Sequence, residues 1–269
     1  MTETNSEAKP LNKINLWGRF SDRATDYAKY RPSYPKEAIA TIISGWENPD
    51  LLVAADIGAG TGIGSRLLAE QGIKVIAIEP NTEMKNAAEF HPLVEFREGT
   101  AESTNIPEKS VDLVTCFHAF HWFNPESTLL EFQRIIKPSG RLAIVWNNWN
   151  REDGFTRENS NLMKQISKAH PMAKKKRNFS IKSLEESPHF MNFRHSAIAH
   201  RQELDLSGLV GRIMSASSVP NQGSEREEIT ANLQILYEKW VDKKGLVYLV
   251  YRTDIYLAEP KPIIVSSRF

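Results

Sequence analysis

The chain has 269 residues, of which 41% are apolar, and its 34 basic and 33 acidic side chains give a formal net charge of +1. A chain of this size can bury a sizeable core, and its near-zero charge produces no global field that would attract nucleic acid or an anionic membrane. A single cysteine, Cys116, allows no intrachain disulfide, and the polar opening residues lack the apolar core of a signal peptide. The apolar runs are far shorter than the ~20 residues that span a bilayer. We therefore expect a cytoplasmic protein without a nucleic-acid or membrane partner.

The first part of the chain predicts a tail and a cap that precede a core. Residues 1–12 are polar and without hydrophobic period, so we expect them to be disordered, and residues 13–48 predict N-terminal cap helices. Over residues 49–150, short apolar runs alternate with segments of helical period, which is typical of strand–helix units in a parallel sheet. Four runs are clear strands and the last is a weaker one: LLVAADI, KVIAIE, VDLVTCF, RLAIVW and LVEFRE.

Helix-ending and helix-starting residues separate these strands. The helix after the first strand stops near Gly72, a suitable residue just past a helix end, and Asn81 can cap the next helix. Asn124 followed by Pro125 predicts a further helix start. That helix should continue until the sequence KPSG turns the chain into the strand RLAIVW. The alternation predicts a doubly wound α/β core.

Beyond residue 150 the regular alternation fades. Residues 151–190 and 205–241 predict a helical cover, while residues 191–204 and 245–258 read as final strands that extend the same sheet. The run Lys174–Arg177 is basic, but without aromatic neighbours or a wider basic composition it predicts a solvated loop. We thus expect one domain over residues 13–269.

Four glycines stand at alternate positions directly after the first predicted strand: Gly58, Gly60, Gly62 and Gly64. Ligands bind at the carboxyl ends of the strands in open α/β sheets, and a glycine loop there can lie directly against a ligand. The dinucleotide fingerprint G-x-G-x-x-G does not fit, because Ile63, Ser65 or Leu67 occupies the place of its third glycine. The stretch reads D-x-G-x-G-x-G instead.

This motif resembles the first motif of class I S-adenosylmethionine-dependent methyltransferases. The later stretch with His-Trp-Phe and KPSG, the segment FSDRATDYAKYRPSYP, and the runs LVGRIMSASSVP and VYLVYRTDIYLAEP resemble a small-molecule subfamily that includes proteins similar to trans-aconitate methyltransferases. The resemblance implies a Rossmann-like sheet of about seven mostly parallel strands, with helices on both faces and an inserted helical cover. Ser218 departs from it, because relatives commonly have an aromatic residue after SAS.

The cofactor that the resemblance implies is S-adenosylmethionine. Glu79 ends the second strand and can accept hydrogen bonds from both ribose hydroxyls, a position that NAD enzymes also use. Asp56 would lie near the methionyl ammonium, Arg31 would pair with the methionyl carboxylate, and Glu102 would accept from the adenine amine. The full set of expected cofactor contacts is Arg31, Asp56, Gly58, Gly60, Thr61, Gly62, Glu79, Pro80, Met84, Ala101, Glu102 and Phe117.

Methyl transfer requires alignment of the acceptor with the methyl group, and a base only if the acceptor must lose a proton. His118 and His121 are the candidates for that base, although the pattern favours polar loop residues that exchange no proton. They do not have the spacing and third ligand of a convincing metal site, so we expect none. The residues expected to contact the acceptor are Tyr27, Tyr30, Trp122, Trp146 and Ser215.

The sequence therefore predicts a methyltransferase for a small-molecule acceptor, at oxygen, nitrogen or carbon. Two alternatives stay open: an NAD-dependent oxidoreductase, and a protein that binds S-adenosylmethionine without catalysis. The acceptor atom is not determined by any residue pattern, and we expect a monomer or a homodimer.

Overall fold

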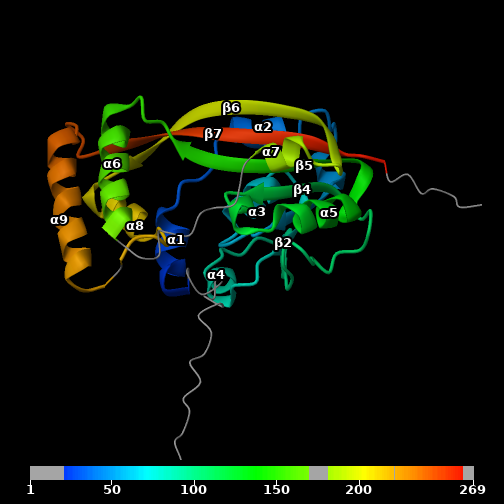
Figure 1. Ribbon diagram of the computed structural model, residues 1–269, viewed down its shortest axis with the longest axis horizontal. Helices are drawn as coiled ribbons and strands as arrows, with labels where there is room; N and C mark the ends of the chain where they lie inside the picture. Colours follow the sequence, from blue (N-terminus) through cyan, green and yellow to red (C-terminus); the bar gives the residue numbers. More distant parts are fainter. Residues whose placement is uncertain (1–20, 170–180, 221, 263–269) are drawn as a thin grey trace, which may run out of the picture.

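The computed structural model describes residues 21–169, 181–220 and 222–262. The expected tail, Phe20 and the basic run Lys174–Arg177 lie outside this part of the chain. Figure 1 shows a long sheet with helices above and below it, and a group of helices gathered at one end.

The sheet contains seven strands in the order β3-β2-β1-β4-β5-β7-β6. Strands β1 to β5 run parallel to one another, and β7 pairs antiparallel with both β5 and β6. The strands are β1 (Val53–Ile57), β2 (Lys74–Ile78), β3 (Val94–Arg97), β4 (Val111–Phe117), β5 (Ile136–Trp149), β6 (Phe190–Leu204) and β7 (Val247–Pro260). The expected doubly wound, Rossmann-like sheet of about seven mostly parallel strands is confirmed.

Helices cover both faces of the sheet. Those of the described residues are α1 (Ala24–Tyr30), α2 (Lys36–Ile42), α3 (Ile63–Ala69), α4 (Thr82–Asn86), α5 (Pro125–Ile135), α6 (Gly154–Ala169), α7 (Lys182–Glu185), α8 (Leu206–Met214) and α9 (Gly223–Trp240). On one face Ile42 of α2 and Leu68 of α3 are fully buried in a cluster that includes Val145 of β5. On the other face Phe132 of α5 and Leu184 of α7 pack in a second cluster.

The expected helix caps at Asn81 and Asn124 are confirmed. The Asn81 side chain accepts a hydrogen bond from the Met84 amide at 2.9 Å, and the Asn124 side chain accepts from the Glu126 amide at 3.1 Å. Both caps satisfy backbone donors that a helix leaves unpaired in its first turn.

The sequence KPSG does not separate helix from strand as expected. It lies inside β5, because Ile136 already pairs with Val111 of β4, and the register then shifts before Arg141 pairs with Leu113. The residues between form an irregularity at which Lys137 makes an ion pair with Asp112 at 2.8 Å. Pairing with a neighbouring strand thus overrides the local turn signal of proline and glycine.

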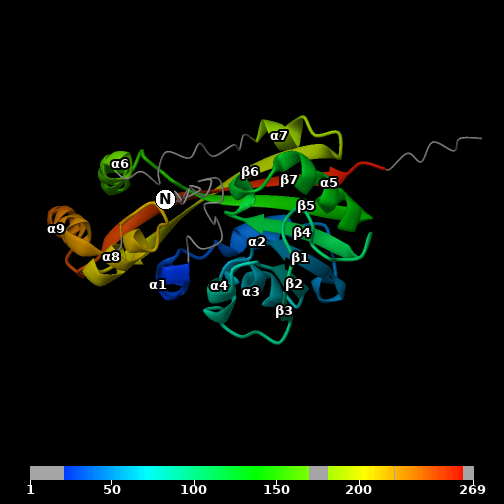
Figure 2. The same cartoon turned by 60° about the horizontal axis from the view of Figure 1, so that its bottom comes forward.

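The far ends of β6 and β7 extend beyond the parallel part of the sheet and carry a helical lobe (Figure 2). Helices α6, α8 and α9 pack there against Leu249 and Tyr251 of β7, both fully buried. Helix α1 packs on α8 where Gly211 meets the ring of Tyr30. In the described residues, none of the helices is long and apolar enough to cross a membrane.

Candidate functional site

The glycine loop joins β1 to α3, and its glycines are required for two different reasons. Gly58, Gly60 and Gly62 adopt φ values of +70°, +58° and +72°, the left-handed region that residues with a Cβ rarely adopt. Gly64 is helical instead, but a Cβ there would lie 2.1 Å from the ring of Phe117. The first three glycines therefore shape the turn, and the fourth lets α3 approach β4.

Glu79 follows β2 and holds the loop in place. Its carboxylate accepts hydrogen bonds from the Gly60 amide at 2.9 Å and from the Asn81 amide at 2.8 Å. The side chain is 8% exposed, and burial raises the pKa of this carboxyl while the two backbone donors oppose the rise. Glu79 thus presents acceptor oxygens beside the loop in an orientation that backbone amides fix.

Asp56, expected near the methionyl ammonium, lies outside the cavity lining. Its carboxylate is fully buried and accepts hydrogen bonds from the hydroxyls of Ser65 at 2.6 Å and Thr115 at 2.9 Å. Desolvation raises the pKa of Asp56 to about 6, although both hydroxyls favour the charged form. Its position ties β1, α3 and β4 together and keeps it out of the cavity lining.

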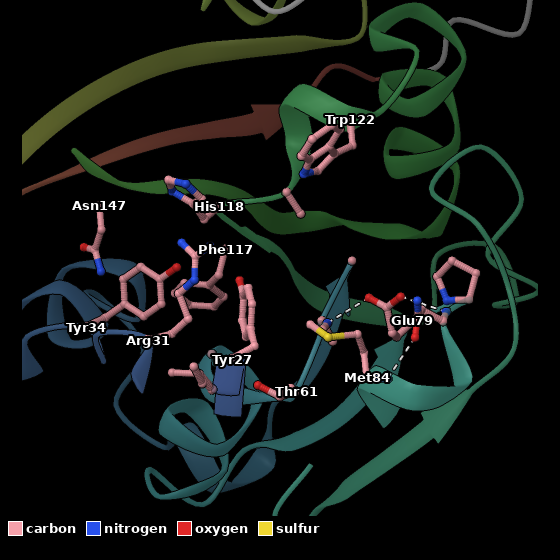
Figure 3. A pocket seen from close by; sticks show the side chains of 18 of the residues that line it. Tyr27, Arg31, Tyr34, Thr61, Glu79, Met84, Phe117, His118, Trp122 and Asn147 are labelled. Atoms are coloured by element: carbon pink, nitrogen blue, oxygen red, sulfur yellow. Dashed lines mark hydrogen bonds between the residues drawn. The ribbon is translucent and has the colours of Figure 1, made fainter. Parts of the chain in front are cut away.

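The segment after α1 covers the loop. Arg31 lies over the ring of Tyr27, with its Cζ 4.6 Å from the ring centroid, and donates to the Ser215 carbonyl of α8 at 3.1 Å. Its Nε is buried and has no partner among the described residues. Burial, followed by repulsion from Arg212, lowers the pKa of Arg31 to about 10. Figure 3 shows Arg31 and Tyr34 at one end of this cavity and Glu79 and Met84 at the other.

The two histidines after β4 are neighbours with different surroundings. His118, at φ +54°, lines the cavity, whereas His121 is outside its lining and accepts a hydrogen bond from the Trp146 indole at 3.3 Å. The rings of His118 and His121 are in edge contact, with centroids 5.5 Å apart. Trp146 points away from the cavity because side chains of β5 alternate between faces, and its neighbour Asn147 lines the cavity instead.

A cavity of about 260 Å³ collects most of the expected residues. Those that line it are Tyr27, Arg31, Gly58, Gly60, Thr61, Glu79, Pro80, Met84, Glu102, Phe117, His118 and Trp122. The expected residues outside its lining are Tyr30, Asp56, Gly62, Ala101, His121, Trp146 and Ser215. Tyr30 packs on Gly211, and the Ser215 hydroxyl donates to the Arg212 carbonyl at 2.8 Å, so both side chains have partners outside the cavity lining. The ligand contacts of these seven residues stay predictions, which the lining of the cavity does not support.

Ten further residues line the cavity beyond the contacts expected from the sequence: Pro32, Tyr34, Ala59, Ile63, Gly64, Asn81, Ala119, Phe123, Asn147 and Arg212. Pro32 and Tyr34 belong to the predicted N-terminal cap. Their closeness in sequence to Arg31, an expected cofactor contact, could have indicated that they line the same cavity. Arg212 stands three residues before Ser215 and comes from α8, far along the chain. In the part of the chain that the structure describes, no three His, Cys, Asp or Glu side chains gather as a metal site would require.

Comparisons with known proteins find methyltransferases that are similar to part of this chain. Residues 55–144 match the family described as a methyltransferase domain. An uncharacterized methyltransferase of Mycobacterium tuberculosis is 36% identical over 140 residues, which cover 52% of this chain and 56% of that protein. The chain therefore spans about half the length of the curated relatives it matches.

Two solved structures show the same fold. A candidate type II methyltransferase from Anaeromyxobacter dehalogenans has a TM-score of 0.65 at 20% identity, covering 86% of this chain and 98% of its own. Phosphoethanolamine N-methyltransferase 2 of Haemonchus contortus, in complex with S-adenosylhomocysteine, has a TM-score of 0.53 at 14% identity and covers 90% of this chain and 58% of its own. The match over residues 55–144 and the relatives thus point to a methyltransferase domain, and the two solved structures share its fold.

Proposed function

We propose that this protein transfers a methyl group from S-adenosylmethionine to a small-molecule acceptor. The observation that carries the proposal is one cavity with Glu79 and the glycine loop at one end and Arg31, under the cover of α1, at the other (Figure 3). These groups match the ribose hydroxyls and the carboxylate of an elongated cofactor.

The residues present fit this cofactor on three independent features. The buried Nε of Arg31 has no partner in the described chain, so its guanidinium can still donate to a carboxylate. Gly58 and Gly60 line the cavity without side chains, and a Cβ on Gly58 would lie 2.8 Å from the Phe123 ring. Glu79 has spare acceptor capacity beyond its two backbone donors, which suits a ribose diol.

The chain's own residues then bind, orient and exclude water. Glu79 would hold the ribose, Arg31 the methionyl carboxylate and Glu102 the adenine amine, while Tyr27 and Trp122 close the cavity. When bound, S-adenosylmethionine supplies a methyl group on a sulfonium, which a nucleophilic atom of the acceptor displaces. Exclusion of water protects that displacement, so much of the catalysis is positioning.

His118 is the base available to an acceptor that must lose a proton. Its ring lines the cavity, and an unperturbed imidazole titrates near neutral pH. A carboxylate acceptor needs no base, and His118 would then only shape the pocket. By its sequence resemblance we place the chain near the trans-aconitate methyltransferases, and the fold shared with a protein that binds S-adenosylhomocysteine supports the same cofactor.

Thermal unfolding with added ligands tests the cofactor. At a hundredfold excess over its Kd, S-adenosylhomocysteine should stabilise the protein by about 2.7 kcal/mol, and NADH should not. A shift with NADH alone would favour the oxidoreductase. Isotopically labelled S-adenosylmethionine incubated with a metabolite extract then tests catalysis, because a labelled product identifies the acceptor. Binding without any labelled product across extracts would favour a non-catalytic protein.

A further inference from the structure

Arg212 is a buried cation in the cavity that the proposed cofactor does not explain. It belongs to α8, lines the cavity and is only 6% exposed. No carboxylate lies within ion-pair distance of its guanidinium among the described residues. A buried charge without a counter-ion is costly, so proteins rarely keep one unless a ligand supplies the opposite charge.

Neutral groups hold this guanidinium in position. Its Nε donates to the Tyr251 hydroxyl at 3.1 Å, and that hydroxyl donates in turn to the Gln202 side chain at 3.1 Å. Gln202 also donates to the Tyr30 carbonyl at 2.9 Å, which links the network to the end of α1. These bonds orient Arg212 without neutralising it, and they leave its two terminal nitrogens for another partner.

A second guanidinium makes the charge imbalance larger. Arg31 donates to the Ser215 carbonyl, one turn beyond Arg212 at the end of α8, and the two cations repel each other enough to contribute to the lowered pKa of Arg31. The two carboxylates of the cavity are engaged elsewhere. Glu79 accepts from two backbone amides, and Glu102 accepts from the Asn124 amide at 3.1 Å.

The charges of the reactants decide what Arg212 binds. The proposed cofactor brings one carboxylate, which Arg31 takes, and two cationic groups, its ammonium and its sulfonium. A second anion must therefore come from the other reactant. We infer that Arg212 binds an anionic group of the acceptor, a carboxylate or a phosphate, which the planar guanidinium fork can accept in bidentate geometry. This inference rests on the proposed function.

Calorimetry with two ligands separates the roles of the two arginines. S-adenosylhomocysteine is titrated into wild type, R212Q, R212K and R31Q, with R201Q as a control because Arg201 is exposed and outside the cavity. Malonate and inorganic phosphate are then titrated, at constant ionic strength, into the protein with and without S-adenosylhomocysteine. The probe that binds distinguishes a carboxylate from a phosphate site.

We expect R212Q to weaken anion binding by about tenfold or more, the range for a hydrogen bond to a charged group, and to change S-adenosylhomocysteine affinity by less than about threefold. R212K should keep part of the anion affinity, and its cofactor binding reports that the variant is folded. R31Q should show the reverse pattern, and R201Q should match wild type in both titrations.

Three results would overturn the inference: wild type binds neither anion, R212Q binds it as wild type does, or R212Q loses S-adenosylhomocysteine as R31Q does. The last would mean that both arginines hold the methionyl carboxylate. Failure of wild type to bind S-adenosylhomocysteine would instead contradict the proposed function, and the titrations of the cofactor-free protein would still report on Arg212.

Discussion

The two carboxylates near the glycine loop differ, because Glu79 lines the cavity and Asp56 is buried outside its lining. Glu79 lines the cavity, so E79Q should weaken S-adenosylhomocysteine binding by about 10- to 100-fold, the range for hydrogen bonds to a charged group. In wild type the Glu79 carboxylate accepts hydrogen bonds from the Gly60 and Asn81 amides. In E79Q one of these amide donors would meet the side-chain NH₂ group, which is itself a donor. Calorimetry measures the loss.

E70Q is the matched control, because Glu70 is exposed at the end of α3 and outside the cavity. Equal affinities for wild type and E79Q would remove Glu79 from the cofactor site. A loss in E70Q as large as in E79Q would show that the effect is not local to the cavity.

The buried carboxyl of Asp56 should make the free energy of unfolding depend on pH. Its folded pKa of about 6 lies above its ordinary value of 3.8, so between these values the unfolded chain binds fewer protons than the folded one. Stability from this residue is complete below pH 3.8 and is lost as the pH rises through about 6, by about 3 kcal/mol in total.

Urea unfolding of wild type and D56N from pH 4 to pH 8 isolates this contribution, because other carboxylates act equally in both proteins. The stability of wild type relative to D56N should fall as the pH rises. A difference that stays constant with pH, or that grows in favour of wild type, would show that Asp56 ionises normally in the folded protein.

The contact between α1 and α8 fixes the position of α1 and of Arg31, which follows it. A Cβ at Gly211 would lie 2.3 Å from the Tyr30 ring, and overpacking of this kind typically costs about 1–3 kcal/mol. G211A should therefore displace α1, move Arg31 from the Ser215 carbonyl and weaken S-adenosylhomocysteine binding by about tenfold.

A double-mutant cycle with Y30A tests the cause by calorimetry. Once the ring is removed, the added methyl group has space, so G211A should have little further effect in the Y30A background. If G211A weakens binding equally with and without the Tyr30 ring, then α8 itself, and not the seating of α1, is responsible.

At the scale of the whole molecule, we expect the segment over residues 21–35 to be mobile when no cofactor is bound. Arg23 donates to the carbonyls of Met214, Ala216 and Val219 at the end of α8, and Ser21 donates to Glu83 of α4, so the segment over residues 21–35 bridges the lobe and the core. A bound cofactor would add Arg31's missing partner. Hydrogen exchange over residues 21–35 should slow when S-adenosylhomocysteine is added, and R31A should lose much of that protection.

Helix α9 serves as an internal reference, because it lies at the outer edge of the lobe and should exchange alike in both states (Figure 1). Equal protection of residues 21–35 with and without ligand, together with normal binding by R31A, would make this segment a fixed part of the scaffold.

Local sequence patterns determined most of the fold. Apolar runs of strand length, the Asn81 and Asn124 caps and the left-handed glycines at Gly58 and Gly60 all act over a few residues, so they can be predicted from short stretches of sequence. The same local signals located the glycine loop and Glu79. The KPSG sequence shows the limit, because pairing of Ile136 with Val111 placed a local turn signal inside a strand.

Tertiary structure alone decided which side chains share the cavity. Trp146 and Asn147 are neighbours in sequence, yet alternation along β5 puts one behind the sheet and the other in the cavity. Asp56 is satisfied by the hydroxyls of Ser65 and Thr115, which only folding brings to it, and Arg212 reaches Arg31 through the packing of α1 on α8. Such contacts depend on residues far apart in the chain, and no local pattern encodes their direction.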